Sequence, residues 1–273
     1  MKLIILSTIL TLATAQLAQA DIMGVGQKVT RVEVSQGQST SVYDGNGNKV
    51  DYSALFGPNG YSKRNISSLY LGESFGIGSN SQIDLNLIYS TLDLGTTTVG
   101  GVSEVGARYL YQAFTNEMFN VNVGFGFRAP AENRADSFTS LSDNLTKFDY
   151  NLDLGYNVIP SFKLGLNTRF TDRNSQIAKS QTLFELYGAY FPTSSVLVSL
   201  SYLAANTSGG PDVLSPGAPF GYINESYNAV SATVGYKVCD MVSVDARYGQ
   251  KLTSNIKNTD ANTTTALGLT ISY

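Results

Sequence analysis

Residues 266–273 of this 273-residue chain read Ala-Leu-Gly-Leu-Thr-Ile-Ser-Tyr. Small or polar residues alternate with apolar ones, and the chain stops on the aromatic Tyr273. In a β-strand, successive side chains point to opposite faces, so a period of two gives the strand two different faces. The stretch therefore predicts a strand with one apolar and one polar side.

The same alternation recurs upstream. Residues 121–128 read Val-Asn-Val-Gly-Phe-Gly-Phe-Arg, and residues 150–156, 162–170 and 242–249 behave alike. An arginine facing lipid near the middle of a bilayer costs about 2–4 kcal/mol, so rows that carry arginine are predicted to face inward. The apolar rows then face lipid.

Twelve segments have this strand character. They run over about 28–43, 63–78, 81–92, 102–115, 118–130, 144–158, 161–172, 180–191, 195–206, 222–238, 241–254 and 262–273. Five tight connections alternate strictly with six longer ones, which lie at about 44–62, 93–101, 131–143, 173–179, 207–221 and 255–261. The pattern predicts an all-β fold, a single antiparallel transmembrane β-barrel of about 12 strands with both termini periplasmic.

Aromatic residues gather at the strand ends beside the tight turns. Tyrosine and phenylalanine are enriched where a membrane meets water, so these residues predict a girdle on the periplasmic side. They are Phe114, Phe119, Tyr156, Phe162, Tyr190, Phe191 and Tyr236.

The first twenty residues have the features of a secretory signal peptide. Lys2 precedes an apolar stretch over 3–15, and Ala18-Gln19-Ala20 is a small-x-small cleavage site. The alternative, a membrane anchor, would need about 20 apolar residues. We therefore expect residues 1–20 to be removed and residues 21–273 to form one barrel domain.

Composition excludes several functions. Charged residues make up 14% of the chain, against about 25% in soluble domains. A net charge of -3 gives no basic face for nucleic acid. Histidine is absent and Cys239 is the only cysteine, so a histidine general base, a histidine or paired-thiolate zinc site and an internal disulfide are all ruled out. We expect no enzyme, no catalytic or metal-binding residue and no cofactor.

The C-terminal strand resembles that of bacterial outer-membrane barrels, in which a final aromatic is read by the insertion machinery. The resemblance implies that Tyr273 is the insertion signal, that the protein resides in the outer membrane, and that outer-membrane lipid and the insertion machinery are its partners.

Two further stretches carry a second resemblance. Residues 43–47, Tyr-Asp-Gly-Asn-Gly, and residues 76–89, Gly-Ile-Gly-Ser-Asn-Ser-Gln-Ile-Asp-Leu-Asn-Leu-Ile-Tyr, are similar to the outer-membrane proteins associated with the meta pathway of phenol degradation. That family implies uptake of small aromatic or apolar compounds, and it has no diagnostic catalytic residues to transfer to this chain.

The rows predicted to face inward carry seven cations and seven anions. These are Arg31, Arg108, Arg128, Lys163, Arg169, Lys237 and Arg247, and Glu33, Asp84, Glu104, Asp149, Asp153, Glu185 and Asp245. Such a balance argues against strong anion or cation selectivity. The residues expected to line a pore are Arg108, Arg128, Asp153, Lys163, Arg169, Glu185, Asp245 and Arg247.

Two functions remain open. One is a monomeric channel through which an unidentified small solute diffuses passively along the charged row. The other is a closed barrel, plugged by side chains that neutralise each other, which acts through its outer loops. The Pro- and Gly-rich loop 207–221 either folds inward as a constriction, binds substrate at the mouth of the barrel or is an ordinary exposed loop. Glu73 interrupts an apolar row, so either a bulge shifts the register there or Glu73 lies near a rim.

Overall fold

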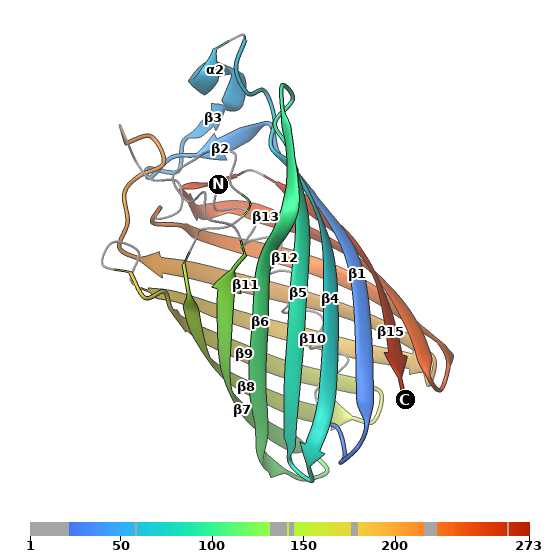
Figure 1. Ribbon diagram of the computed structural model, residues 1–273. Helices are drawn as coiled ribbons and strands as arrows, with labels where there is room; N and C mark the ends of the chain where they lie inside the picture. The colour runs from blue at the N-terminus through green and yellow to red at the C-terminus, as the bar shows by residue number, and fades with distance from the viewer. Residues whose placement is uncertain are drawn as a thin grey trace.

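Twelve antiparallel strands close into a barrel in the computed structural model, which describes residues 22–57, 59–131, 141, 145–175, 180–215, 223–260 and 262–273 (Figure 1). The expected signal peptide lies outside these residues. The barrel strands are β1 (Lys28–Gln38), β4 (Asn65–Gly78), β5 (Ser81–Asp93), β6 (Thr98–Thr115), β7 (Phe119–Pro130), β8 (Lys147–Ile159), β9 (Phe162–Asp172), β10 (Ser180–Thr193), β11 (Val196–Ser208), β12 (Ser226–Cys239), β13 (Val242–Lys257) and β15 (Thr263–Ser272). Each barrel strand pairs with the next along the chain, and β15 closes the sheet against β1.

The wall separates an apolar outside from a polar inside, as the alternation predicts. In β7, Val123, Phe125 and Phe127 are 40–47% exposed, whereas Asn122 and Arg128 are each 4% exposed. A soluble protein would not leave contiguous rows of such side chains in water. The outer surface is therefore a lipid-facing belt. Among the described residues, no helix is long and apolar enough to cross a bilayer.

The five short turns lie together at one end of the barrel, which we call the periplasmic end. In each of the five hairpins the pairing register shifts just before the turn, for example between Gln112 and Phe114. Both described ends of the chain reach this end too, because the Lys28 and Tyr273 backbones exchange hydrogen bonds of 2.8 and 2.9 Å. The predicted girdle is present here, with Phe119 stacked on Tyr156 at 4.8 Å between ring centroids.

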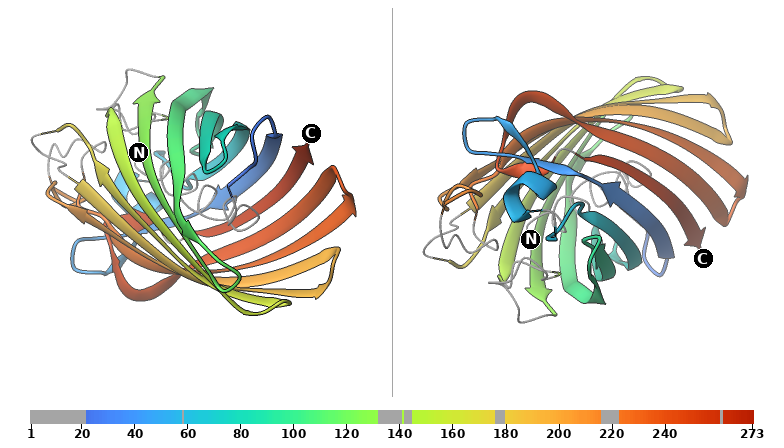
Figure 2. Two further views of the ribbon diagram at one scale, coloured as in Figure 1. Left: turned by 90° about the horizontal axis from the view of Figure 1, so that it is seen from below. Right: turned by 90° about the horizontal axis from the view of Figure 1, so that it is seen from above.

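The opposite, outer end carries a second sheet. Strands β2 (Ser41–Tyr43), β3 (Lys49–Asp51) and β14 (Thr259–Asp260) pair in the order β14-β2-β3, and a short helix, α2 (Tyr52–Phe56), follows β3. Figures 1 and 2 show these elements beyond the ends of the barrel strands, on the side away from the C-terminus. We call residues 39–64 together with β14 the cap.

Two predicted boundaries were wrong. The expected strand 28–43 is two strands, because the Ser39 hydroxyl bonds the backbone of Ser41 and turns the chain out of the barrel into β2. The expected loop 93–101 is shorter, since β6 begins at Thr98 and Gly95, at φ 92°, makes the tight connection. The strands β5 and β6 therefore extend as a hairpin beyond the rest of the wall (Figure 1).

The apolar core lies inside the outer half of the barrel. One cluster joins β10 to β13, and a second lies at the outer ends of β4 and β5. Their members are Leu183, Leu203, Ala205, Tyr227, Ala229 and Ile256 in the first, and Ile66, Leu92, Leu94 and Leu141 in the second. Buried charged side chains occupy the rest of the interior, from Lys147 and Arg128 near the outer ends of β8 and β7 to Arg31 near the periplasmic end of β1, and these charged residues form the candidate site.

Candidate functional site

Inward-facing charged side chains form the candidate site. All eight residues expected to line a pore lie on inward rows: Arg108 on β6, Arg128 on β7, Asp153 on β8, Lys163 and Arg169 on β9, Glu185 on β10, and Asp245 and Arg247 on β13. Strand alternation places them there, because each is flanked by residues of the lipid-facing rows. Contacts divide seven of them into distinct groups, and Lys163 lines the periplasmic cavity described below.

A first cluster of ions joins β6, β7 and β8. The Arg128 guanidinium donates to both oxygens of Asp149, at 2.5 and 2.8 Å, and reaches Glu104 at 3.5 Å. Lys147 donates to the same Glu104 oxygen at 3.0 Å, and the Thr171 hydroxyl donates to Asp149 at 2.6 Å. Each of these charges therefore has an opposite charge within reach.

A second cluster spans the closure of the barrel between β1, β15 and β13. Glu33 accepts from Arg31 at 2.5 Å and from Arg247 at 2.7 Å, and Arg31 also donates to Asp245 at 2.7 Å. Glu33 is 1% exposed and Arg247 is 4% exposed. These contacts tie the first strand of the barrel to the last hairpin. We call the first and second clusters together the paired clusters.

Arg108 makes a separate pair. It donates to one oxygen of Asp84 from two nitrogens, at 2.5 and 2.9 Å, and the Gln82 amide donates to the other oxygen at 2.5 Å. Three of the predicted residues, by contrast, make no ion pair with any residue that the structure describes.

These three residues are Asp153, Arg169 and Glu185, on the neighbouring strands β8, β9 and β10, and we call them the open group. Asp153 Oδ1, Arg169 Nε and Glu185 Oε2 are buried and have no hydrogen-bond partner in the described part of the chain. Glu185 is 2% exposed and Arg169 is 8% exposed. Burying an ionised group without a partner costs several kcal/mol, so each of these groups is either neutral or completes its contacts with water or a solute.

The wall on β11, β12 and β15 carries small inward side chains instead. Ser199, Ser201, Ser231 and Thr264 lie in these rows, and the Ser201 and Ser231 hydroxyls bond each other at 2.8 Å. Gly268, also on β15, leaves room for the side chains of Arg31 and Asp245, which would lie within 3 Å of any added Cβ. The inward rows of β11 and β12 are therefore lined by short side chains, whereas long charged side chains project from β6 to β10 and from β1 and β13.

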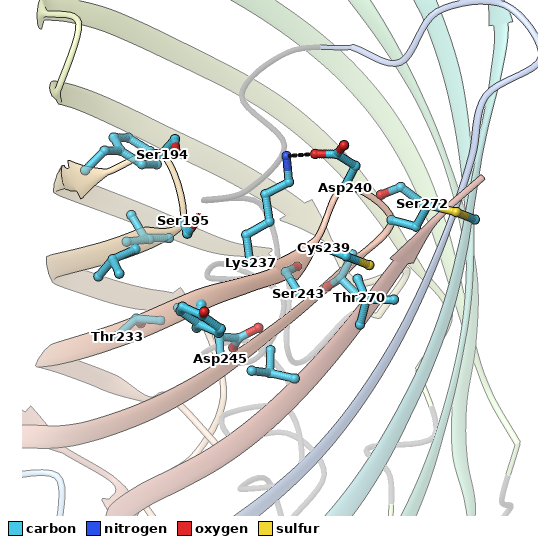
Figure 3. Close-up of a pocket in the computed structure, with 18 of the residues that line it drawn as sticks. Ser194, Ser195, Thr233, Lys237, Cys239, Asp240, Ser243, Asp245, Thr270 and Ser272 are labelled. Carbon is cyan, nitrogen blue, oxygen red and sulfur yellow. Dashed lines mark ion pairs between the residues drawn. The ribbon is translucent and has the colours of Figure 1, made fainter.

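A cavity of about 360 Å³ lies along this short-chain wall at the periplasmic end (Figure 3). Thr233, Asp245 and Thr270 line it, and Arg31 of the second paired cluster borders it. At its rim Lys237 and Asp240 form an exposed ion pair of 2.7 Å, and this contact lowers the pKa of the Asp240 carboxyl. Arg31 and Asp245 of the second paired cluster therefore border a cavity at the periplasmic end, which we call the vestibule.

The cap is fastened at the outer end by buried polar contacts. The Tyr52 hydroxyl of α2 donates to Asp260 of β14, and Arg64 pairs with the same carboxylate at 3.4 Å. Lys251 of β13 donates to Thr259 at 2.6 Å. Burial, reinforced by the negative charge of Asp260, raises the pKa of Tyr52 well above its usual range, so the phenol stays protonated and remains a donor.

Sequence reasoning missed several of these residues. Lys147 lies two residues before Asp149 in the same inward row, so extending the alternation by one step would have found it. Arg64 and Asp260 lie outside the barrel strands, where no periodicity marks them. Lys237 lies at the rim and not in the interior row. Within the described residues, no group of three acidic or cysteine side chains is arranged to hold a metal ion.

The Pro- and Gly-rich loop is described only in part. The Val213 backbone donates to Asn258 beside β14 at 2.9 Å, and the Asn224 backbone donates to the Pro211 carbonyl at 3.1 Å. The described portion therefore packs against the cap, and residues 216–222 lie outside the described chain.

No family model and no curated protein matches the sequence. Solved structures do match the fold. The COG4313 outer membrane channel from Pseudomonas putida F1 superposes with a TM-score of 0.73 at 12% identity over 93% of this chain and 98% of that one. The NanC porin gives 0.55 at 11% identity, covering 88% of this chain and 98% of the porin.

The translocator domain of the autotransporter NalP from Neisseria meningitidis gives a TM-score of 0.51 at 12% identity, covering 98% of this chain and 96% of the domain. At such low identities the likeness establishes the architecture and not the cargo. The lipid-facing belt, the twelve-stranded closure and these neighbours agree on one conclusion. The chain has the fold of a bacterial outer-membrane β-barrel.

Proposed function

We propose that the protein is a monomeric outer-membrane channel through which small solutes diffuse passively. The observation that carries the proposal is the open group, three charged side chains in the middle of the barrel whose contacts the described residues do not complete. Ions that only neutralise each other inside a plugged barrel would be paired, as Arg128 and Asp149 are. Unpaired ions in the interior need water, and water in the interior is what a diffusion channel requires.

The arrangement of charge along the interior supports weak ion selectivity. The paired clusters hold both signs in contact, for example Arg31 with Glu33 and Asp245. The electric field of each cation is therefore offset locally by that of a neighbouring anion. A solute would meet a wet passage with little net charge, followed by the vestibule at the periplasmic end.

The apolar side chains in the outer half of the interior are evidence that the cargo is a small apolar or aromatic solute. The two apolar clusters line this half beneath the cap, and Tyr43 and Tyr61 of the cap pack against them. A solute with an aromatic ring that passed the cap would contact side chains of its own polarity here. The neighbouring outer-membrane channel supports the same general role at the level of the fold.

One observation favours a different function. The cap closes over the outer end with buried ionic contacts, and Arg64 and Asp260 are each 1% exposed. Contacts of that kind suit a fixed outer surface, so a closed barrel that binds a partner through its outer loops is the second candidate. In that case the open group would have to be neutral or completed by trapped water.

Single-channel recording separates the two candidates. The mature chain, residues 21–273, is refolded, checked for heat-modifiable migration, and inserted into a planar bilayer over a range of salts and voltages. A channel gives discrete steps that scale with salt and a reversal potential near zero in a salt gradient. Uptake of labelled aromatic compounds into liposomes that contain the protein then tests the cargo.

Silence from folded protein, together with no solute uptake, would contradict the channel. Silence with aromatic uptake retained would mean that apolar solutes pass where ions do not. If the protein is a channel, deletion of residues 209–215 should leave its conductance steps intact. If the outer loops carry the function, the same deletion should abolish partner binding.

A further inference from the structure

Glu73 is an exception on the lipid-facing surface. In the described barrel strands, the other charged residues of the outward rows occupy the first or last position of their strand: Lys28, Asp93, Asp172 and Lys257. Lys237 lies at the periplasmic rim, two residues from the end of β12. Glu73 lies within β4, in the row of Leu69 and Leu71, where a carboxylate facing hydrocarbon is unfavourable.

No bulge turns Glu73 inward. The pairing of β4 with β1 is continuous from Ile66 to Phe75, and its pairing with β5 is continuous as far as Gly76. Glu73 lies opposite Thr30, and Thr30 lies opposite Ile271 on the other side of β1. Glu73 therefore stands on the outer face at the level where β1 begins and β15 ends, which is the periplasmic edge of the lipid belt.

The contacts of Glu73 are hydroxyl groups and not cations. Thr30 Oγ1 donates to Glu73 Oε1 at 2.7 Å, and the Tyr273 hydroxyl lies 3.0 Å from Thr30 Oγ1 and 3.4 Å from the carboxylate. No ion pair to Glu73 exists within the described residues. Hydroxyl donors orient the carboxylate but leave its negative charge uncompensated.

A cation lies on the same face, two residues closer to the periplasmic end than Thr30. Lys28 lies opposite Phe75 in the pairing of β1 with β4, and its Nζ is 5.6 Å from the centre of the Phe75 ring. Lys28 is exposed and makes no ion pair in the described part of the chain. In this geometry Lys28 and Glu73 are diagonal neighbours, about 7–8 Å apart along the wall.

We propose that Glu73 and Lys28 form a binding site for the headgroup of an amine-bearing zwitterionic phospholipid in the periplasmic leaflet. The carboxylate receives the ammonium in charge-assisted hydrogen bonds, and Lys28 contacts the phosphate. The site carries one charge of each sign, as the headgroup does, and the short linker between the phosphate and ammonium of phosphatidylethanolamine spans diagonal neighbours when the headgroup lies along the wall. The acyl chains, attached on the phosphate side at Lys28, then pass Glu73 and lie along the apolar row above, on Leu69 and Leu71.

Native mass spectrometry of the delipidated, refolded mature chain tests this site. The protein is mixed with equal amounts of phosphatidylethanolamine, phosphatidylcholine and phosphatidylglycerol that carry the same acyl chains. We expect retention of phosphatidylethanolamine over phosphatidylcholine by roughly tenfold, because the trimethylammonium group has no N–H to donate. Equal retention of the three lipids by the wild-type protein would overturn the proposal, and this comparison needs no variant.

Variants of the two charged residues test whether they cause the preference for phosphatidylethanolamine. Glu73→Gln should reduce phosphatidylethanolamine retention to the level of phosphatidylcholine, and Lys28→Gln should lower retention of both. Asp93→Asn, which removes an outward carboxylate at the other end of the wall, is the matched control and should leave the preference unchanged. A preference that survives Glu73→Gln in protein with wild-type heat-modifiable migration would also overturn the site.

Discussion

The paired clusters and the open group have similar residue types in similar inward rows, yet they differ in what surrounds them. Arg128 has Asp149 and Glu104 as partners, whereas Arg169, on a neighbouring part of the same wall, has no ion-pair partner among the described residues. The difference separates two tasks. Paired ions hold strands to one another, whereas the open group makes no ion pair within the described chain and, in the proposed channel, would face water or solute.

Removing a partner from a paired cluster should have the largest effect. Arg128→Ala leaves the buried carboxylates of Asp149 and Glu104 without the guanidinium, and breaking a buried ion pair in this way costs about 3–5 kcal/mol. Urea-induced unfolding of the refolded barrel in liposomes measures the loss. A loss below about 1 kcal/mol would show that the paired clusters are solvated and would remove the distinction on which the comparison rests.

An intermediate effect is expected in the cap. Tyr52→Phe removes the hydroxyl donor to the buried Asp260 carboxylate, which costs about 1–3 kcal/mol of cap stability. Hydrogen exchange of the Tyr52 backbone amide, which donates to the Thr40 carbonyl, should become roughly tenfold faster. Amides within the barrel strands serve as the internal control and should exchange at unchanged rates.

Substitutions in the open group should change the ion selectivity of the channel and leave the stability of the barrel nearly unchanged. Glu185→Gln removes one negative charge from the interior, so the reversal potential in a salt gradient should shift toward anions. The free energy of unfolding should change by less than about 1 kcal/mol, because no ion pair within the described chain is broken. A large destabilisation with unchanged selectivity would assign Glu185 to the wall and favour the closed barrel.

The smallest effect is expected at the periplasmic rim. Lys237→Ala removes an ion pair between exposed side chains, a kind of contact that contributes little to stability. Unfolding should match that of the wild-type protein within error, and conductance should change only slightly. The variant is therefore a control for Arg128→Ala, since both remove one cation from the barrel.

Much of the wall could be predicted from the sequence, because membrane strands have a strict period of two. Residues 121–128 are enough to place Arg128 inside and Phe125 outside, and both placements hold. In β8 the same alternation places Lys147 in the inward row, two residues before Asp149. The outward row of β4 also marks Glu73 as an exception without deciding between a bulge and a rim position, and the continuous pairing of β4 excludes the bulge.

The partners could not be predicted, because they depend on the register between strands. Arg128 and Asp149 meet only because Gly126 lies opposite Asp149 in the pairing of β7 with β8. Periodicity likewise cannot distinguish Arg128 from Arg169, although their surroundings differ. The cap joins Arg64 to Asp260, 196 residues apart in the sequence, through segments that lack any repeat.

The central claim is that water fills the middle of the barrel, and cysteine accessibility tests it most directly. In a Cys239→Ser background, Ser201→Cys places a thiol beside Glu185, and Leu200→Cys places one on the lipid-facing surface, where Leu200 is 65% exposed. The protein in liposomes is then treated with a small charged thiol reagent. We predict rapid modification at position 201 and none at position 200, and protection of position 201 in folded protein would contradict a water-filled channel.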